Sequence, residues 1–134
     1  MTNSRQIGAS FERNIATQLK ENLGIDFRRN LQQYQTKDLS DLITDSPSLF
    51  PFAIECKRRA SGKTYSYDWW EQVLKSAKLL DKRPCLIYQL MRSPVKVVLN
   101  MNCIIETFGG NALGQEHLVE MSLESFCMIA RELM

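Results

Sequence analysis

Hydrophobic residues recur at every fourth position near the start of the chain, at Ile7, Phe11, Ile15, Leu19 and Leu23. This spacing places them on one face of an α-helix, and Gly24 directly after them is a typical helix stop. Residues 25–34 then mix hydrophobic and polar positions on both faces, which indicates a partly exposed strand. Residues 36–47 gather polar groups around three hydrophobic ones, a pattern typical of a loop or a short strand.

The clearest strand pattern lies between Phe50 and Lys57. Its even-numbered positions are all apolar: Phe50, Phe52, Ile54 and Cys56. Side chains alternate between the two faces of a strand, so Glu55 and Lys57 share the opposite face. We interpret this stretch as a strand with one face in the core, followed by a flexible basic link over residues 58–64.

A second helical stripe follows at Trp69, Trp70, Val73, Leu74, Ala77 and Leu80. Ser66 is its predicted N-cap, and the helix is expected to end before Pro84. Residues 85–91 and 95–99 read as two apolar strands joined across a short turn. Their near-continuous hydrophobicity indicates a hairpin in the interior of a sheet.

Three glycines between residues 109 and 114 indicate a loop, a short strand is expected over residues 117–121, and Ser122 then caps a final helix. That helix has an apolar face made by Phe126, Ile129, Ala130 and Leu133. The order helix, strands, helix, strands, helix predicts an α/β fold, with a mixed central sheet flanked by helices. Because the chain has 134 residues and 44% of them are hydrophobic, we expect residues 1–134 to form one domain around one core.

The composition disfavours several classes of protein. No apolar run approaches the ~20 residues that cross a bilayer, and the polar N-terminus lacks a secretory signal, so we expect a soluble cytoplasmic protein without membrane contact. The four cysteines are widely spaced, with no Cys-x-x-Cys pair, and are expected to be reduced core residues. His117 is the only histidine, which disfavours chemistry based on several imidazoles.

Charge is unevenly distributed along the chain, although the net charge is only +2. Residues 1–37 carry six basic and three acidic side chains, residues 38–54 carry three acidic and no basic ones, and residues 55–83 carry eight basic and four acidic ones. A short acidic segment between two basic ones suits an enzyme that holds a cation and, around it, a polyanion. Ordinary solvated charge explains the same distribution. The pattern therefore supports an enzyme of this kind only together with specific candidate residues.

Glu55 and Lys57 are expected to lie about 6 to 7 Å apart on one face of their strand. A carboxylate holds a hard cation such as Mg²⁺, while a neighbouring lysine orients or deprotonates water and stabilises charge that develops on a phosphate. A simple ion pair across the face is the alternative. Asp41 favours the metal site, because the chain between it and Glu55 is long enough to bring the two carboxylates together. Asp38 and Asp45 compete for the same role, and acid-rich loops also arise from turn chemistry.

Two further candidates lie on the predicted helices. Glu12 is at the edge of the first apolar stripe, between the small residues Gly8 and Ala16, which leaves room for another group. Gly8 indicates close approach by backbone or ligand, unless it lies in the fraying end of the helix. Gln72 is expected at the border of the buried face of the second helix, where a structural role is the common alternative.

Together these residues resemble the PD-(D/E)XK nucleases, and within them the small Holliday junction resolvases of archaea and some phages. The resemblance runs from Gly8 to about Asn100. It is carried by Gly8-Ala9-Ser10-Phe11-Glu12, Ser40-Asp41-Leu42, Ile54-Glu55-Cys56-Lys57, Gln72-Val73 and Pro84-Cys85-Leu86-Ile87-Tyr88. Ser40 stands where the motif name has proline, a frequent variation that removes no catalytic group.

The resemblance implies a restriction-endonuclease-like core and phosphodiester hydrolysis by water bound to Mg²⁺ or Mn²⁺. It assigns Asp41 and Glu55 as metal ligands and Glu12 as an additional acid near the metal. It assigns Lys57 as the catalytic lysine and Gln72 as a residue that supports the site. It also implies a homodimer, with two active sites on opposite strands of a DNA junction.

Basic residues around that site are expected to bind the DNA backbone: Arg5, Arg13, Arg28, Arg29, Arg58, Arg59 and Lys63. No recognition helix is evident, which favours a shape-selective or weakly specific enzyme over a sequence-specific one. Trp69, Trp70 and Tyr67 offer stacking surfaces for splayed bases, although core packing is expected for at least one tryptophan.

The sequence therefore predicts a metal-dependent, structure-selective DNA endonuclease, with a Holliday junction resolvase as the leading hypothesis and with host or phage origin left open. A restriction-type, mismatch or single-strand nuclease is the alternative among enzymes. A non-catalytic DNA-binding module on the same fold is the alternative outside them. A purely structural protein is a third hypothesis, and it predicts no salt-sensitive DNA affinity.

Overall fold

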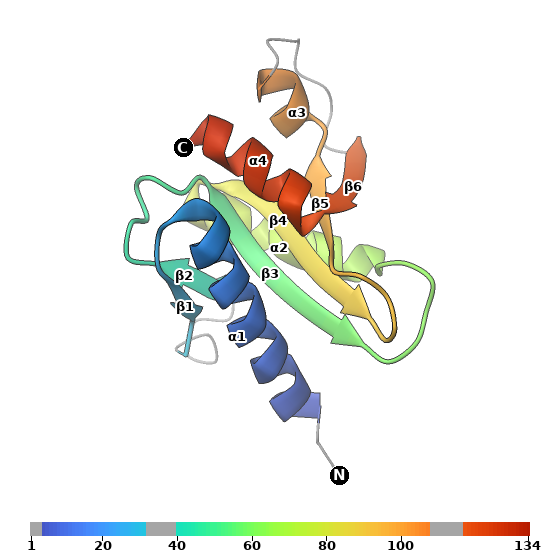
Figure 1. The fold of residues 1–134 in the computed structure, drawn as a ribbon. Helices are drawn as coiled ribbons and strands as arrows, with labels where there is room; N and C mark the ends of the chain where they lie inside the picture. Colours follow the sequence, from blue (N-terminus) through green and yellow to red (C-terminus); the bar gives the residue numbers. More distant parts are fainter. Residues whose placement is uncertain (1–3, 32–39, 108–116) are drawn as a thin grey trace.

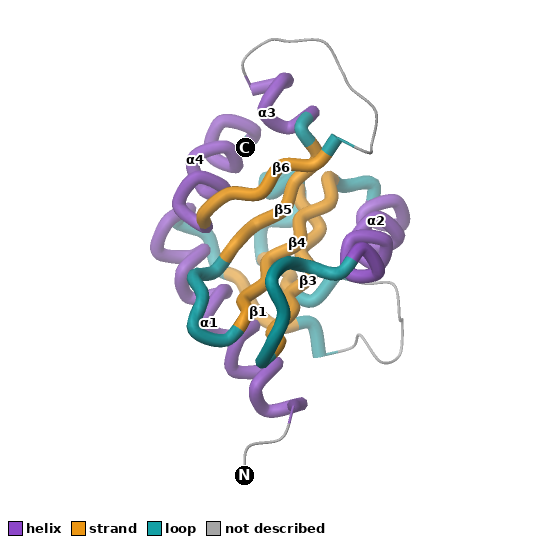
Figure 2. The backbone as a smooth tube through the Cα atoms, turned by 90° about the vertical axis from the view of Figure 1, so that its right-hand side faces the viewer, coloured by secondary structure: helices purple, strands orange, loops and turns teal. Residues whose placement is uncertain are grey.

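The computed structural model describes residues 4–31, 40–107 and 117–134 of the chain. Along these residues the elements are α1 (Ser4–Leu23), β1 (Phe27–Arg29), β2 (Leu42–Thr44), β3 (Phe52–Arg59), α2 (Tyr67–Leu80), β4 (Arg83–Leu90), β5 (Lys96–Asn100), α3 (Asn102–Thr107), β6 (Leu118–Ser122) and α4 (Leu123–Leu133). Helices cover both faces of a central sheet, so the molecule has three layers (Figures 1 and 2).

The six described strands form one mixed sheet in the order β1-β2-β3-β4-β5-β6. β3 and β4 run parallel and are joined by α2, which crosses over one face of the sheet. The other neighbouring strands pair antiparallel. In Figure 2, α1 and α4 lie on one side of the sheet and α2 lies on the other. The predicted α/β class and the mixed sheet flanked by helices are therefore confirmed.

Two hydrophobic clusters hold the layers together. The first lies between the sheet and the pair α1 and α4, and it includes Ile15, Leu19, Ile54 and Phe126. The second lies between the sheet and α2, and it includes Trp70, Val73, Leu86 and Tyr88. Burying such side chains contributes roughly 1.5–3 kcal/mol each relative to leaving them exposed.

β3 is covered on both faces, and the expectation that only one of its faces lies in the core is wrong. Ala53 and Glu55, on the face under α2, are 0% and 1% exposed. The alternation of Phe52–Arg59 predicted which side chains share a face, but it did not show that α2 also buries the more polar face. A strand between two helical layers has no solvated side along its buried length.

Most local signals agree with the structure. Gly24 ends α1 with φ at +76°, a conformation that glycine adopts without strain. Ser66 and Ser122 cap α2 and α4 by accepting hydrogen bonds from the backbone N–H groups of Asp68 and Ser125. The hairpin of β4 and β5 lies inside the sheet as predicted, and all four cysteines are free and buried. No helix among the described residues is both long and apolar enough to cross a membrane.

Other expectations need correction. β1 covers only three residues, and the rest of the strand predicted over residues 25–34 is loop or lies outside the described residues. β3 continues to Arg59, so the predicted basic link begins later than residue 58. The short helix α3 was not predicted, and the predicted glycine loop at residues 109–114 lies outside the described residues. Nothing in the described structure lies within 4 Å of a Cβ placed on Gly8, so its expected close approach to backbone is absent there.

Replacing Gly8 with alanine is expected to raise the free energy of unfolding by about 0.5–1 kcal/mol, because alanine favours a helix and the site is open. The matched control, Gly24→Ala, should destabilise the protein, since that residue has a positive φ. Urea unfolding followed by circular dichroism measures both changes. A loss of stability in Gly8→Ala would contradict this reading of α1.

Candidate active site

The candidate site is built on β3, on the face that α2 covers. Glu55 lies there almost fully buried, with Lys57 half-buried two positions further along the strand. The Oγ atom of Ser76, a buried residue of α2, donates a hydrogen bond of 2.9 Å to Glu55 Oε1. Glu55 and Lys57 thus lie opposite Ile54 and Cys56, as the alternation predicted.

Asp41, immediately before β2, is held against β3 by two hydrogen bonds. Its backbone N–H donates to the Ile54 carbonyl at 2.8 Å, and its Oδ2 atom accepts from the Cys56 N–H at 2.6 Å. On the side of β1, the Asn30 N–H donates to the Asp41 carbonyl at 2.9 Å. These contacts fix the Asp41 carboxyl beside the two peptide groups that flank Glu55.

The two carboxyls interact strongly. Burial of Glu55, the negative charge of Asp41 and a hydrogen bond between the two side chains raise the pKa of Glu55 to about 9. The hydrogen bond from Ser76 and the charge of Lys57 oppose this rise. Glu55 Oε2 is buried, and no N–H group or hydroxyl of the described residues donates a hydrogen bond to it. A hydrogen bond between two carboxyls needs a proton, so the pair holds one at neutral pH.

Glu12 approaches the same place from α1. Its Oε2 atom accepts a hydrogen bond of 2.6 Å from Nε of Arg29 on β1. Burial raises the pKa of Glu12, the hydrogen bond from Arg29 lowers it, and the charge of Asp41 raises it again. Glu12 therefore lies within electrostatic reach of Asp41, but in this structure it is engaged with an arginine.

The structure separates Asp41 from Asp45, one of its two rivals. Asp45 lies beyond the other end of β2, is exposed, and forms an ion pair with Arg28. Asp38 lies outside the described residues. Gln72, expected at the border of the buried face of α2, is exposed and lies next to the buried residues Val73 and Ser76. Its carbonyl oxygen, one helical turn from Ser76, accepts a hydrogen bond of 3.3 Å from the Ser76 hydroxyl.

Ser76 was not assigned to the site from the sequence, although it contacts Glu55 directly. The available signal was a small polar residue between Val73 and Ala77 on the buried face of a helix. A hydroxyl at such a position needs a partner, since an unpaired buried polar group is unfavourable. The sequence did not show that Glu55 is that partner.

A divalent cation suits the carboxyl pair. Among the residues that the structure describes, no three acidic, cysteine or histidine side chains are grouped to hold a metal. Asp41 and Glu55 nevertheless present hard oxygen ligands. No N–H group or hydroxyl of the described residues donates a hydrogen bond to the buried Glu55 Oε2 atom. Two adjacent buried carboxyls therefore fit a hard cation, which would replace the proton that they hold in this structure.

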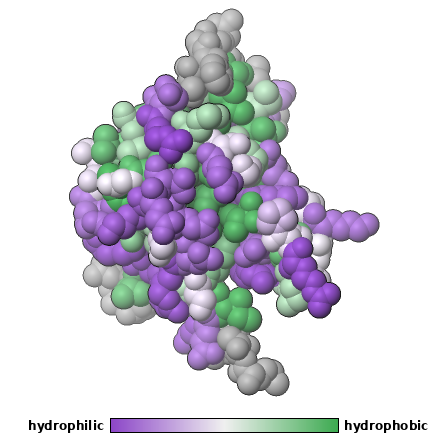
Figure 3. All heavy atoms as spheres, in the orientation of Figure 1, coloured by the Kyte–Doolittle hydropathy of each residue, from purple (hydrophilic) through white to green (hydrophobic). Residues whose placement is uncertain are grey.

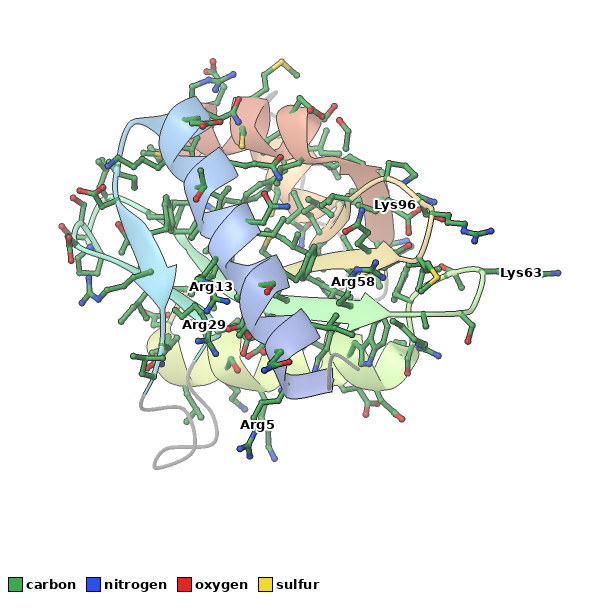
Figure 4. The ribbon with its side chains drawn as sticks, turned by 60° about the horizontal axis from the view of Figure 1, so that its bottom comes forward. Arg5, Arg13, Arg29, Arg58, Lys63 and Lys96 are labelled. Atoms are coloured by element: carbon green, nitrogen blue, oxygen red, sulfur yellow. The ribbon has the colours of Figure 1, made fainter. Side chains whose placement is uncertain are left out.

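The predicted DNA-binding residues fall into three groups. Arg13, Arg28 and Arg29 line a cleft of about 930 Å³ between α1 and β1, and Arg29 joins this cleft to Glu12. Arg58, Arg59 and Lys63 lie at the end of β3 and in the turn after it, and Arg5 lies near the start of α1. In Figure 4, Arg13 and Arg29 lie together beside α1, while Lys63 points away from the other labelled residues.

The surface around α1 is largely hydrophilic. Figure 3 shows the face that carries α1 and α4, where hydrophobic atoms come to the surface only in smaller areas. Two of the arginines in the cleft already have acidic partners, Arg28 with Asp45 and Arg29 with Glu12. The cleft therefore carries charges of both signs, and it does not contain the carboxyl pair.

The chain belongs to the family described as phage putative PDDEXK endonucleases, whose model matches residues 3–124. The family resemblance inferred from the sequence is thereby confirmed. No curated protein matches the chain.

Among solved structures, the chain is similar to Hjc of the archaeal hyperthermophile Archaeoglobus fulgidus, a Holliday junction resolvase. The TM-score is 0.56, and the match covers 93% of this chain and 99% of that one at 16% sequence identity. At this identity the likeness establishes the fold, so the restriction-endonuclease-like core is confirmed.

The raised pKa of Glu55 predicts how stability depends on pH. Between about 4.5 and about 9, folded Glu55 keeps a proton that an unfolded glutamate loses, so the free energy of unfolding should fall as pH rises through this window. Glu55→Gln should flatten this fall and raise stability at pH 8 by about 2 kcal/mol or more, since each pKa unit corresponds to ~1.4 kcal/mol. Urea titrations of both metal-free proteins at several pH values measure this. Parallel pH profiles would contradict the assignment.

Ser76→Ala should lower the free energy of unfolding by about 1–2 kcal/mol, because it removes the hydroxyl that hydrogen-bonds buried Glu55. The matched control is Thr17→Ala, which removes a hydroxyl bonded to the Arg13 carbonyl on the exposed side of α1. That variant should stay within about 0.5 kcal/mol of the parent. Urea unfolding measures both variants. An equal fall in the free energy of unfolding would show that the hydrogen bond to Glu55 stabilises the protein no more than the exposed one does.

Proposed function

We propose that the chain is a metal-dependent, structure-selective endodeoxyribonuclease that resolves four-way DNA junctions. The observation that carries this proposal is the buried pair of Asp41 and Glu55, with Lys57 next to it on the same strand face. Membership of an endonuclease family supports the nuclease activity. The similarity of fold to a Holliday junction resolvase supports the choice of substrate.

Asp41 and Glu55 would hold the cation, Mg²⁺ or Mn²⁺. When bound, such a cation polarises a phosphate oxygen and lowers the pKa of a coordinated water. Glu55 would release its proton on binding, because a carboxyl group that binds a cation must be deprotonated. Glu12 would act as an additional acid once Arg29 turns toward DNA, because the two side chains are paired in this structure.

Lys57 is the proposed catalytic lysine. Its ammonium forms no ion pair within 4 Å among the described residues, yet its charge acts on both Glu12 and Glu55. It would orient the attacking water and stabilise the charge that develops on the phosphate. Gln72, which is exposed one turn from Ser76, would support the site through water or DNA.

DNA would be bound mainly through its phosphates by Arg5, Arg13, Arg28, Arg29, Arg58, Arg59 and Lys63. Charge-based binding of this kind weakens steeply with salt and carries little sequence information. We further propose that residues 1–134 act as one nuclease domain and that two copies form a homodimer. A dimer would place one active site on each of two opposed strands.

Cleavage of a labelled four-way junction with Mg²⁺ or Mn²⁺, compared with linear duplex of the same sequence, tests the proposal. Asp41→Asn, Glu55→Gln and Lys57→Met should each lower the rate by about 100-fold or more, as expected for groups that act on the reacting phosphate. Asp45→Asn, the matched control at the other end of β2, should keep at least half of the activity. Intact junctions with the wild-type protein, or full activity in Glu55→Gln, would overturn the proposal. Preferred cleavage of duplex would favour a restriction-type enzyme.

A further inference from the structure

Arg59 continues the row of side chains that forms the candidate site. Glu55, Lys57 and Arg59 occupy alternate positions of β3, so they share one face at steps of about 6 to 7 Å. The row therefore runs from the carboxyl pair, through the lysine, to an arginine at the end of the strand.

The guanidinium of Arg59 is held in place by an aromatic ring. Its Cζ atom lies 4.4 Å from the centroid of the Trp69 ring, within the range of a cation–π contact. Trp69 is itself half-buried in the first turns of α2, and its ring lies 6.1 Å from that of the buried Tyr88. The turn after β3 also approaches Arg59, since a Cβ placed on Gly62 would lie 4.0 Å from Arg59 Nη1.

Arg59 has no acidic partner within 4 Å among the described residues, unlike Arg28 and Arg29, which pair with Asp45 and Glu12. It is also exposed. A stacked guanidinium keeps its outer N–H donors available and loses little conformational freedom when it binds an anion. Arg59 is therefore ready to bind a phosphate from outside the molecule.

Further aromatic side chains lie close in sequence to Trp69 or contact the same ring as it does. Besides Trp69, the Tyr65 ring lies 5.7 Å from that of Tyr88, and Tyr67 is 61% exposed at the start of α2. Cationic grooves with accessible aromatic rings typically bind single-stranded nucleic acid, because every base has a face that stacks. Bases inside a duplex are already stacked and gain nothing from such a ring.

We propose that Arg59 and Trp69 form a DNA subsite that binds a phosphate next to the one at Lys57, on a strand whose neighbouring base is unpaired and stacks near Tyr67. This proposal rests on the proposed nuclease function and deepens it. It makes the single-stranded character of a branch point, rather than a duplex arm, the feature recognised on this side of the site. The bound strand runs along β3, from the carboxyl pair toward Arg59.

Binding measured without metal, in a Glu55→Gln background that does not cleave, tests the subsite. The probes are a fluorescein-labelled oligothymidylate and a blunt duplex of equal length, titrated by fluorescence anisotropy at several salt concentrations. Arg59→Ala should weaken binding of the single strand at least fivefold and reduce the slope of log K against log salt by about 0.7, the value for one phosphate contact. Its binding of duplex should change less than twofold.

Two further variants sharpen the result. Arg59→Lys keeps the charge but loses the planar stack, so single-strand affinity should fall by an intermediate factor with the slope retained. Lys78→Ala, which removes an exposed charge near the other end of α2, is the matched control and should have little effect. Unchanged single-strand affinity in Arg59→Ala, an equal loss in Lys78→Ala, or an equal loss for duplex would each overturn the subsite.

Failure of the subsite is distinguishable from failure of the nuclease proposal. Junction cleavage by the wild-type protein together with unchanged single-strand binding in Arg59→Ala would remove the subsite alone. Weakened single-strand binding in Arg59→Ala together with no cleavage by the wild type under Mg²⁺ or Mn²⁺ would remove the nuclease function and leave a single-strand binding surface.

Discussion

The main-chain clamp between Asp41 and β3 is the interaction on which the candidate site depends. The N–H of Asp41 bonds to the Ile54 carbonyl, and the Cys56 N–H bonds to the Asp41 carboxyl, so two peptide groups around Glu55 hold one acid in place. Moving Asp41 away would leave buried backbone groups unpaired, which costs about 1–3 kcal/mol for each. The clamp therefore keeps two carboxyls together that would otherwise repel each other, and a shared proton makes this tolerable in the metal-free state.

The three-layer architecture explains why this proton is needed. β3 lies inside the sheet, between β2 and β4, and beneath both α1 and α2, so Glu55 is shielded from water. The same burial that raises the pKa of Glu55 also removes competing water from its oxygens. A cation entering this place would meet ligands that are already oriented, and it would replace the proton as the positive charge between them.

The sequence predicted the parts of the site that depend on local pattern. Strand alternation placed Glu55 and Lys57 on one face, and the helical stripes with their serine caps located α2 and α4. It could not choose Asp41 over Asp45, because that choice depends on which residue before or after β2 pairs with β3. It also missed the contact of Ser76 with Glu55, since that contact depends on how α2 is rotated about its axis over the sheet. A short helix such as α3 has too few residues to show a periodic stripe.

The basic residues differ in whether an acidic side chain neutralises them. Arg28 and Arg29 are neutralised by acids, so the cleft beside α1 offers less free positive charge than its composition indicates. Lys57 and Arg59 have no such partners within 4 Å among the described residues, and they follow the carboxyl pair along β3. Charge on this face thus changes from negative at Asp41 and Glu55 to positive at the end of the strand. Under the proposed function, a polyanionic strand would be attracted to the positive end first. A cation at the carboxyl pair would then let the strand extend across the negative end and bring a phosphate to Lys57.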